Sequence, residues 1–207
     1  RPCVQPRSPP DPAAMSSRRK PSEKRRGRRP QRFERPRGLV VTEGTVTEIQ
    51  YLQMLQQQLP RNAASLKLIG EGSDPLRVVK RALRERKDGD YSWTVCLVDR
   101  DKHETLQDAF RLATEEDIRV LVSNPCFELW LLWHLEDWRR HSSSRNVQAR
   151  LAKLKVLQDK SLTSSFPIGR YADARARSDK ASPEHLVNHL GPNPSSPIPV
   201  LLELLGI

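Results

Sequence analysis

At residues 93–101 the chain reads WTVCLVDRD, and this stretch decides the fold. Its first six residues are apolar at nearly every position on both faces of an extended strand, which is typical of the central strands of parallel sheets. Two carboxylates, Asp99 and Asp101, follow the apolar run directly. We therefore predict a buried parallel strand that ends in an acidic loop.

Three shorter apolar runs around this strand indicate further strands of one sheet. They are Leu39–Thr42 and Leu66–Ile69 upstream and Arg119–Val122 downstream. Strands that alternate with helices at this spacing imply right-handed crossovers and a mainly parallel sheet. The sequence therefore predicts an α/β fold with a parallel central sheet flanked by helices, and 207 residues suit one such domain.

The segments between the strands carry helix start signals. Helices are predicted over residues 45–59, 74–87 and 104–116. Thr45 and Glu48 have the T-x-x-E spacing of a capping box, which favours a capping role for Glu48 over a metal-binding one. Asp74 and Pro75 supply an N-cap and a first helical residue for the second helix.

After the fourth strand the chain reads SNPCFELWLLWHL at residues 123–135, which predicts a buried helix with Asn124 as its cap and Pro125 in its first turn. Glu128 is the exception within this helix, because a carboxylate there loses hydration. It is predicted either to pair with a buried Arg or to line a site. Asn124 and His134 are grouped with Glu128 as candidate supporting residues of such a site, although for His134 a packed side chain is favoured over a catalytic base.

Residues 136–207 are polar and irregular, and we predict a helical C-terminal extension. It contains a predicted helix at Val147–Leu157 and an Arg-rich stretch at Tyr171–Lys180. Its last apolar turn, Pro199–Leu205, is predicted to dock onto the core.

The strong positive charge of the chain is concentrated near its N-terminus. Residues 1–37 carry 13 Lys and Arg against 3 Asp and Glu, a net of +10 out of a total of +11. Because this segment is rich in Pro, Arg and Ser and poor in large apolar residues, we predict a disordered basic arm. Its cations suit sequence-independent binding to RNA or DNA phosphates, the alternative being a merely solvated extension. They include Arg18, Arg19, Lys20, Lys24, Arg25, Arg26, Arg28 and Arg29.

The predicted domain covers residues 38–207, with its recognisable core at 38–135. The chain does not begin with Met, and a basic stretch that resembles a natural start follows Met15. We therefore hold as a hypothesis that residues 1–14 are not native.

The cysteines argue against two kinds of structural site. Cys3, Cys96 and Cys126 are odd in number, widely spaced and without a C-x-x-C pattern, which disfavours a disulfide framework and a zinc site and favours a reducing cytoplasm. No apolar run is long enough to span a membrane, and no secretory leader is recognised. Without a G-x-x-x-x-G-K-[ST] motif, the chain is not expected to act alone as an ATP-driven motor.

Carboxylates follow two of the predicted strands at their carboxyl ends, where open parallel sheets bind ligands. Glu43 and Gly44 follow the first strand, and glycine lets the backbone turn tightly beside a ligand. Asp99 and Asp101 lie two residues apart and face the same side of an extended chain. Hard oxygen ligands of this kind suit Mg²⁺ or Mn²⁺. The alternative is that the two Asp residues only end the strand and cap the next helix.

Three blocks of the sequence resemble the RloB-like proteins, a family found near restriction-modification and phage-defence genes in bacteria. The blocks are VTEG at 41–44 with Thr47, Glu48 and Tyr51, VDRD at 98–101, and SNPCFELW at 123–130 with His134. The match covers about residues 38–135, and its last block is the most specific.

That family is in turn similar to the Toprim group of topoisomerases, primases and OLD-type nucleases. The resemblance implies a Toprim-like three-layer core in which Glu43, Asp99 and Asp101 hold Mg²⁺ during phosphodiester chemistry. It also implies a role in anti-phage defence beside an AAA-type or ABC-type ATPase. Lys102 follows where Toprim proteins often have Gly, which leaves the substrate open.

Functions of different classes remain as hypotheses. The first is a Mg²⁺-dependent nuclease that cuts RNA, including transfer RNA, or DNA, with Arg100 or Lys102 stabilising charge on the phosphate and Glu128 orienting a metal-binding group. The second is a non-catalytic adaptor or sensor that binds a nucleic acid or an ATPase. A third places the function in the basic arm.

Overall fold

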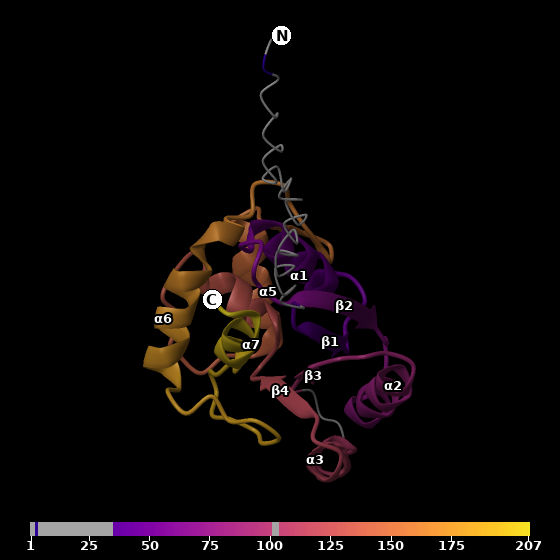
Figure 1. The fold of residues 1–207 in the computed structure, drawn as a ribbon. Helices are drawn as coiled ribbons and strands as arrows, with labels where there is room; N and C mark the ends of the chain where they lie inside the picture. The colour runs from indigo at the N-terminus through magenta and orange to yellow at the C-terminus, as the bar shows by residue number, and fades with distance from the viewer. Residues whose placement is uncertain (1–2, 4–34, 101–103) are drawn as a thin grey trace. The chain divides into compact units, whose positions relative to one another are not determined.

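Four parallel strands form the central sheet of the computed structural model (Figure 1). They are β1 (Arg37–Thr42), β2 (Ser65–Gly70), β3 (Trp93–Asp99) and β4 (Arg119–Ser123). Their spatial order is β2-β1-β3-β4, and each neighbouring pair is parallel. The predicted parallel sheet is confirmed.

The structure describes Cys3, residues 35–100 and residues 104–207. The chain divides into two units, Arg1–Phe33 and Glu34–Ile207, and all the strands and helices described here belong to the second. The predicted cations of the arm, from Arg18 to Arg29, lie outside the described residues, as do Asp101 and Lys102. The sheet itself begins slightly earlier than predicted, because Arg37 is already part of β1.

Helices cover both faces of the sheet, so the fold has three layers (Figure 1). Helix α1 (Thr47–Gln58) packs on one face, and α2 (Pro75–Lys87) and α3 (Leu106–Glu115) pack on the other. Alternate residues of β3 serve the two apolar cores: Val95 and Leu97 face α1, whereas Cys96 and Val98 face α2 and α3. This two-sided burial is the reason that nearly every residue of β3 is apolar.

The strand order creates a switch point between β1 and β3. The chain moves from β1 to β2 in one direction and then crosses back over β1 to reach β3 and β4. The two directions place α1 and α2 on opposite faces, because such crossovers are right-handed. A crevice for ligands therefore opens at the carboxyl ends of β1 and β3.

The C-terminal part packs on the same face as α1, opposite α2 and α3 (Figure 1). It consists of α4 (Glu128–Trp133), α5 (Ser144–Lys153), a hairpin of β5 (Leu157–Gln158) and β6 (Ser161–Leu162), a short 3-10 helix η1 (Ile168–Arg170), α6 (Tyr171–Ala181) and α7 (Ile198–Leu205). Leu201, Leu202 and Leu205 of α7 are buried in this core, as predicted for the last apolar turn.

Three local predictions were wrong. Thr45 does not cap α1. The N-cap residue of this helix is Val46, and there is no capping hydrogen bond from its side chain. The helix predicted to run to Leu157 ends at Lys153, and Leu157 belongs to β5.

The third wrong prediction concerns Asn124, which does not cap the buried helix. Its backbone pairs with Ser195 in an isolated antiparallel bridge, and its Nδ2 donates to the Gly191 carbonyl at 2.9 Å. The backbone of Asn124 is thus held in this bridge, and α4 begins only at Glu128.

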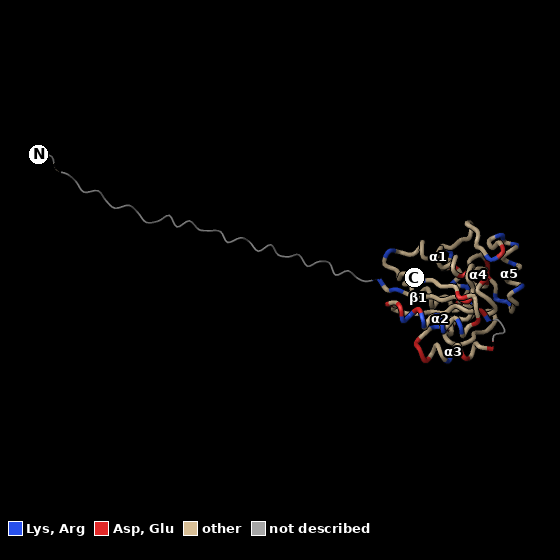
Figure 2. The backbone as a smooth tube through the Cα atoms, turned by 90° about the vertical axis from the view of Figure 1, so that its right-hand side faces the viewer, with Lys and Arg blue, Asp and Glu red and all other residues tan. Residues whose placement is uncertain are grey.

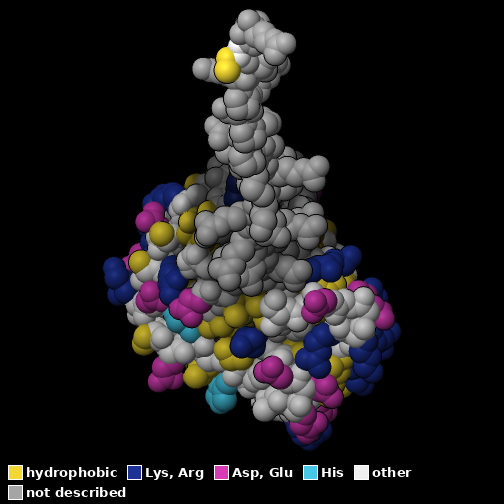
Figure 3. All heavy atoms as spheres, viewed as in Figure 1, with side chains coloured by type: hydrophobic (Ala, Val, Ile, Leu, Met, Phe, Trp, Pro, Cys, Tyr) yellow, Lys and Arg dark blue, Asp and Glu magenta, His cyan; other side chains and the backbone are white. Residues whose placement is uncertain are grey.

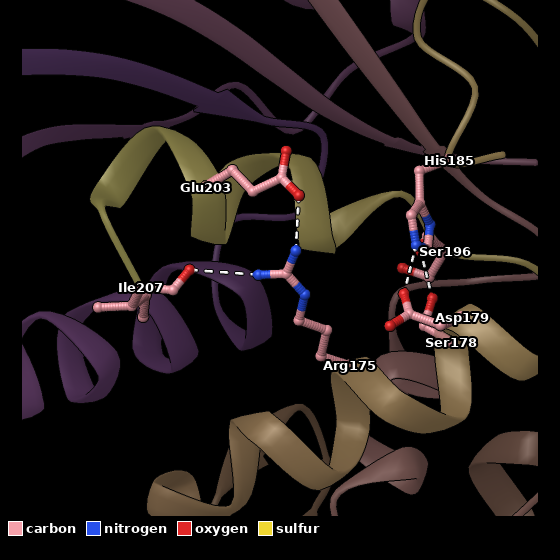
Figure 4. Close-up of polar contacts among 7 residues, drawn as sticks. All are labelled: Arg175, Ser178, Asp179, His185, Ser196, Glu203 and Ile207. Carbon is pink, nitrogen blue, oxygen red and sulfur yellow. Dashed lines mark hydrogen bonds and ion pairs between the residues drawn. The ribbon is translucent and has the colours of Figure 1, made fainter. Parts of the chain in front are cut away.

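Polar contacts fasten α6 to α7 and to the end of the chain (Figure 4). Arg175 donates to Glu203 Oε1 at 2.6 Å and to the Ile207 carbonyl at 3.4 Å. Ser178, which is fully buried, donates to the Ser196 carbonyl at 2.8 Å. The Arg-rich stretch predicted at 171–180 is thus a helix that holds the C-terminal segment in place.

The surface of the domain carries both signs of charge, as the near-neutral balance of residues 38–207 predicts. Segments of Lys and Arg and segments of Asp and Glu are both scattered over the described tube (Figure 2). The face in Figure 3 shows both signs of charge with apolar areas between them. Within the described residues, none of the helices has the length and apolarity needed to span a membrane.

Candidate functional site

The ends of β1 and β3 lie side by side and are joined by hydrogen bonds. The backbone N–H of Glu43 donates to the Leu97 carbonyl at 2.9 Å, which continues the pairing of the two strands by one residue. The backbone N–H of Asp99 donates to Glu43 Oε2 at 3.2 Å. The acids that follow two separate strands in the sequence therefore meet at one point, at the switch point of the sheet.

Asp99 is also held by the segment before α4. Its Oδ1 accepts a hydrogen bond from the backbone N–H of Phe127 at 2.8 Å. Burial raises the pKa of the Asp99 carboxyl well above its ordinary value, and the negative charges of Glu128, Glu48 and Glu43 raise it further against the opposing effect of the Phe127 N–H. A cation beside Asp99 would relieve this repulsion.

Glu48 projects into the same region from the first turn of α1. It is only 8% exposed, and its Oε1 accepts a hydrogen bond from the Gly44 backbone N–H at 3.1 Å. Burial raises the pKa of the Glu48 carboxyl, and the charges of Glu128 and Glu43 act in the same direction. A Cβ at Gly44 would collide with the Glu48 carboxylate, so the glycine allows this close approach.

Glu128 completes the acidic group from the first turn of α4. Its side chain is half-buried, and its Oε1 accepts a hydrogen bond from Gln148 Nε2 of α5 at 3.1 Å. Of the two readings of Glu128, the structure supports a place in the wall of the site, since its hydrogen-bond partner is Gln148 and not a buried Arg. Its charge also acts beside burial to raise the pKa of the Cys126 thiol.

These side chains surround a cleft of about 580 Å³. Five acids and one Lys lie among its described lining residues, so acidic side chains outnumber basic ones. The lining residues are Glu43, Gly44, Thr45, Val46, Thr47, Glu48, Gly72, Ser73, Asp74, Asp99, Glu128, Gln148 and Lys160.

The donor atoms of the cleft fit a lightly ligated divalent cation. Within residues 35–100 and 104–207, no three acid, His or Cys side chains converge closely enough to enclose a metal ion. Mg²⁺ needs fewer, because it keeps several waters and often takes one or two carboxylates plus substrate phosphates. Glu43 and Asp99 offer hard oxygens of this kind inside a negative field. Asp101, the third predicted ligand, lies outside the described residues.

Three of the residues proposed from the sequence do not line the cleft. Arg100 is exposed beyond the end of β3, and Asn124 is buried in its bridge to Ser195. His134 is fully buried, with Nδ1 3.0 Å from the Trp130 carbonyl and Nε2 3.3 Å from the Tyr51 hydroxyl. The reading of His134 as a packed histidine is confirmed.

Other lining residues were not identified as site residues from the sequence. Lys160 and Gln148 come from the extension that is polar and irregular in sequence, where no spacing signals a site. Asp74 was predicted, correctly, as the cap of α2, accepting from the Arg77 N–H, and the structure adds that this cap forms part of the rim.

A sequence model of one family, described as RloB-like protein, matches residues 38–205. The match thus includes the C-terminal extension as well as the core at 38–135. Neither the search of curated proteins nor that of solved structures found a match.

Proposed function

The chain belongs to the RloB-like protein family, and on that premise we propose that its acidic cleft is the active site of a nuclease that depends on Mg²⁺ or Mn²⁺. The observation that carries the proposal is the junction of Glu43 and Asp99 at the switch point of a parallel sheet. The raised pKa of Asp99 supports it, since acids with perturbed pKa values in a cleft are often functional.

The residues of the cleft have separate roles in this proposal. Glu43 and Asp99 hold the cation, while the Phe127 N–H fixes the orientation of the Asp99 carboxylate. Gln148 orients Glu128, and Glu48 fixes the turn at Gly44. When bound, Mg²⁺ supplies a Lewis acid for the scissile phosphate and lowers the pKa of a coordinated water.

The finer assignments rest on resemblance. We propose that the domain is of the Toprim type, that its substrate is RNA, including transfer RNA, or DNA, and that it acts in anti-phage defence beside an AAA-type or ABC-type ATPase. A cytoplasmic location belongs to the same proposal, supported by the buried free thiols of Cys96 and Cys126.

The test is an incubation of the purified full chain with labelled RNA, transfer RNA and DNA in Mg²⁺, in Mn²⁺ and in EDTA. We expect cleavage of at least one substrate with either metal and none in EDTA. Glu43→Gln and Asp99→Asn should each lower the rate by at least about 100-fold, the scale of losing one essential electrostatic group. Both changes keep the shape of the side chain and its ability to accept the observed hydrogen bonds.

Asp108→Asn is the matched control, because Asp108 is an exposed acid of α3 that pairs with Arg111 at the surface. It should cleave at the rate of the unaltered chain. Binding of a nucleic acid without turnover in any metal would replace the nuclease by the adaptor or sensor function. Full activity of Asp99→Asn would remove Asp99 from the site.

A further inference from the structure

We infer that the acidic cleft continues into a groove between α5 and the β5–β6 hairpin, where Lys160 and Arg145 bind the phosphate backbone of a single-stranded nucleic acid. The inference rests on the proposed function for the nature of the ligand. It assigns the path that the strand takes as it leaves the reacting phosphate.

The groove and the cleft share a wall. A second cavity, of about 450 Å³, lies beside the first and is also lined by Glu128, Gln148 and Lys160. The shared residues place the two cavities side by side. A ligand that occupies the acidic end reaches the face of α5 by passing over these shared side chains.

One face of α5 forms a side of the groove. Arg145, Gln148, Ala149 and Ala152 line it and follow the i, i+3, i+4, i+7 spacing of a single helix face. The buried residues of α5 point the opposite way, into the apolar core. The two alanines leave space beside the long side chains, so this exposed face is hollow where a solvated helix face usually carries bulky polar groups.

The hairpin forms the other side and is fastened to the site. Thr47 Oγ1 donates to the Lys160 carbonyl at 2.7 Å, and the Leu162 N–H donates to Gln50 Oε1 at 2.8 Å. Both anchoring side chains come from α1, whose first turn also supplies Glu48. The backbone of Lys160 is thus fixed relative to the acids, while its side chain is exposed to ligand.

The charges differ between the cleft and the groove. Lys160 is the one Lys or Arg among the described residues of the acidic cleft. The groove adds the cation Arg145 and the carboxylate Asp159, so its two cations balance its two acids, Glu128 and Asp159, whereas the cleft has five acids and one cation. A polyanion placed over the acids alone would be repelled, so its affinity must come from cations beside them. Lys160 and Arg145 are the cations among the described residues that line the groove, which suits them to bind the phosphates next to the reacting one.

The experiment measures binding separately from cleavage. In the Glu43→Gln chain, in EDTA, the affinity for a labelled single-stranded 12-mer is followed by fluorescence anisotropy at several salt concentrations. Adding Lys160→Ala and Arg145→Ala should raise Kd on the order of tenfold at 0.1 M salt. It should also reduce the slope of log affinity against log salt by about 1.4, since each phosphate contact on a single strand contributes about 0.7. The Glu43→Gln chain with Lys160→Arg should bind the 12-mer with the same Kd as the Glu43→Gln chain alone.

The matched control is the pair Lys180→Ala and Arg111→Ala, which removes one exposed Lys and one exposed Arg away from the groove. The inference would be overturned if the variant with Lys160→Ala and Arg145→Ala had the same affinity for the 12-mer, and the same dependence of affinity on salt, as the control variant. Equal competition by inorganic phosphate and by the 12-mer per phosphate group would also overturn it, because the site would then take a small anion and not a strand.

The two proposals fail in different ways. Suppose that the unaltered chain cleaves in Mg²⁺ while the variant with Lys160→Ala and Arg145→Ala binds the 12-mer with unchanged affinity. The groove is then contradicted as a strand-binding site, and the nuclease function is supported. Suppose instead that no substrate is cleaved but the variant with Lys160→Ala and Arg145→Ala binds the 12-mer weakly. The nuclease function is then contradicted, and the groove is supported as the strand-binding site.

Discussion

Asp99 shows at the scale of one residue how the site opposes the stability of the fold. Because the pKa of Asp99 is raised in the folded chain, its contribution to stability is full below the ordinary Asp pKa and is lost as the pH rises through the raised value. At pH 7 in EDTA, Asp99→Asn should therefore raise Tm by a few degrees, on a scale of roughly 2–4 °C per kcal/mol. The difference in Tm between Asp99→Asn and the unaltered chain should become smaller as the pH is lowered. Thermal unfolding between pH 5 and 8 measures it, and a lower Tm for Asp99→Asn at every pH would contradict it.

His134 has the opposite dependence on pH. Burial lowers its pKa to about 4, with Arg170 and Arg177 acting in the same direction. Its contribution to stability is therefore present above the ordinary value near 6.5 and is lost as the pH falls toward 4, by up to about 3 kcal/mol.

Urea unfolding from pH 7 to pH 4.5 tests this role of His134. His134→Gln should be less stable at pH 7 yet lose less stability on acidification than the unaltered chain. The exposed His141→Gln is the control and should follow the unaltered chain. Equal acid sensitivity of His134→Gln and the unaltered chain would contradict the assignment.

At the scale of elements, an ion pair links α5 to the segment that follows α4. Arg150 donates to Glu136 through Nε at 2.8 Å and through a terminal nitrogen at 2.6 Å, and this pairing lowers the pKa of the Glu136 carboxyl. Because solvent screens a pair at the surface, Arg150→Met should lower the free energy of unfolding only slightly. This effect should disappear as the pH falls below the ordinary Glu value of 4.5 and through the lowered pKa of Glu136, and urea unfolding at pH 7 and at pH 3 checks it. Arg139→Met, at an exposed pair with Asp137, is the control.

The elements also show which structure the sequence can predict. The strands and α2 carry their own signals, namely apolar runs such as that of β3 and the Asp74 cap, so local reasoning was sufficient. Asn124 has the chemistry of a cap, but a residue 71 positions later, Ser195, pairs with its backbone. Likewise, Lys160 enters the cleft only because Thr47 binds the hairpin. Contacts between distant segments leave no local pattern, so the acids of the site were predictable and its far wall was not.

At the scale of the whole molecule, the arm and the domain should separate in function. A chain that lacks residues 1–33 keeps all of β1. It should retain metal-dependent cleavage while its affinity for non-specific DNA falls and becomes less sensitive to salt, since most of the cations of the arm are gone. Cleavage rates and filter binding at 50 and 200 mM salt measure both effects. Complete loss of activity with an unchanged Tm would move the function to the arm.

Four acids of the cleft come from the end of β1, from α1, from β3 and from α4, and they are spread from residue 43 to residue 128. No fragment of the chain shorter than this span contains the cleft, and β3 must insert beside β1 before Glu43 and Asp99 can meet. During synthesis the cleft can therefore form only after β3 has paired with β1 and α4 has been made. On the proposed function, nuclease activity begins only with the folded domain.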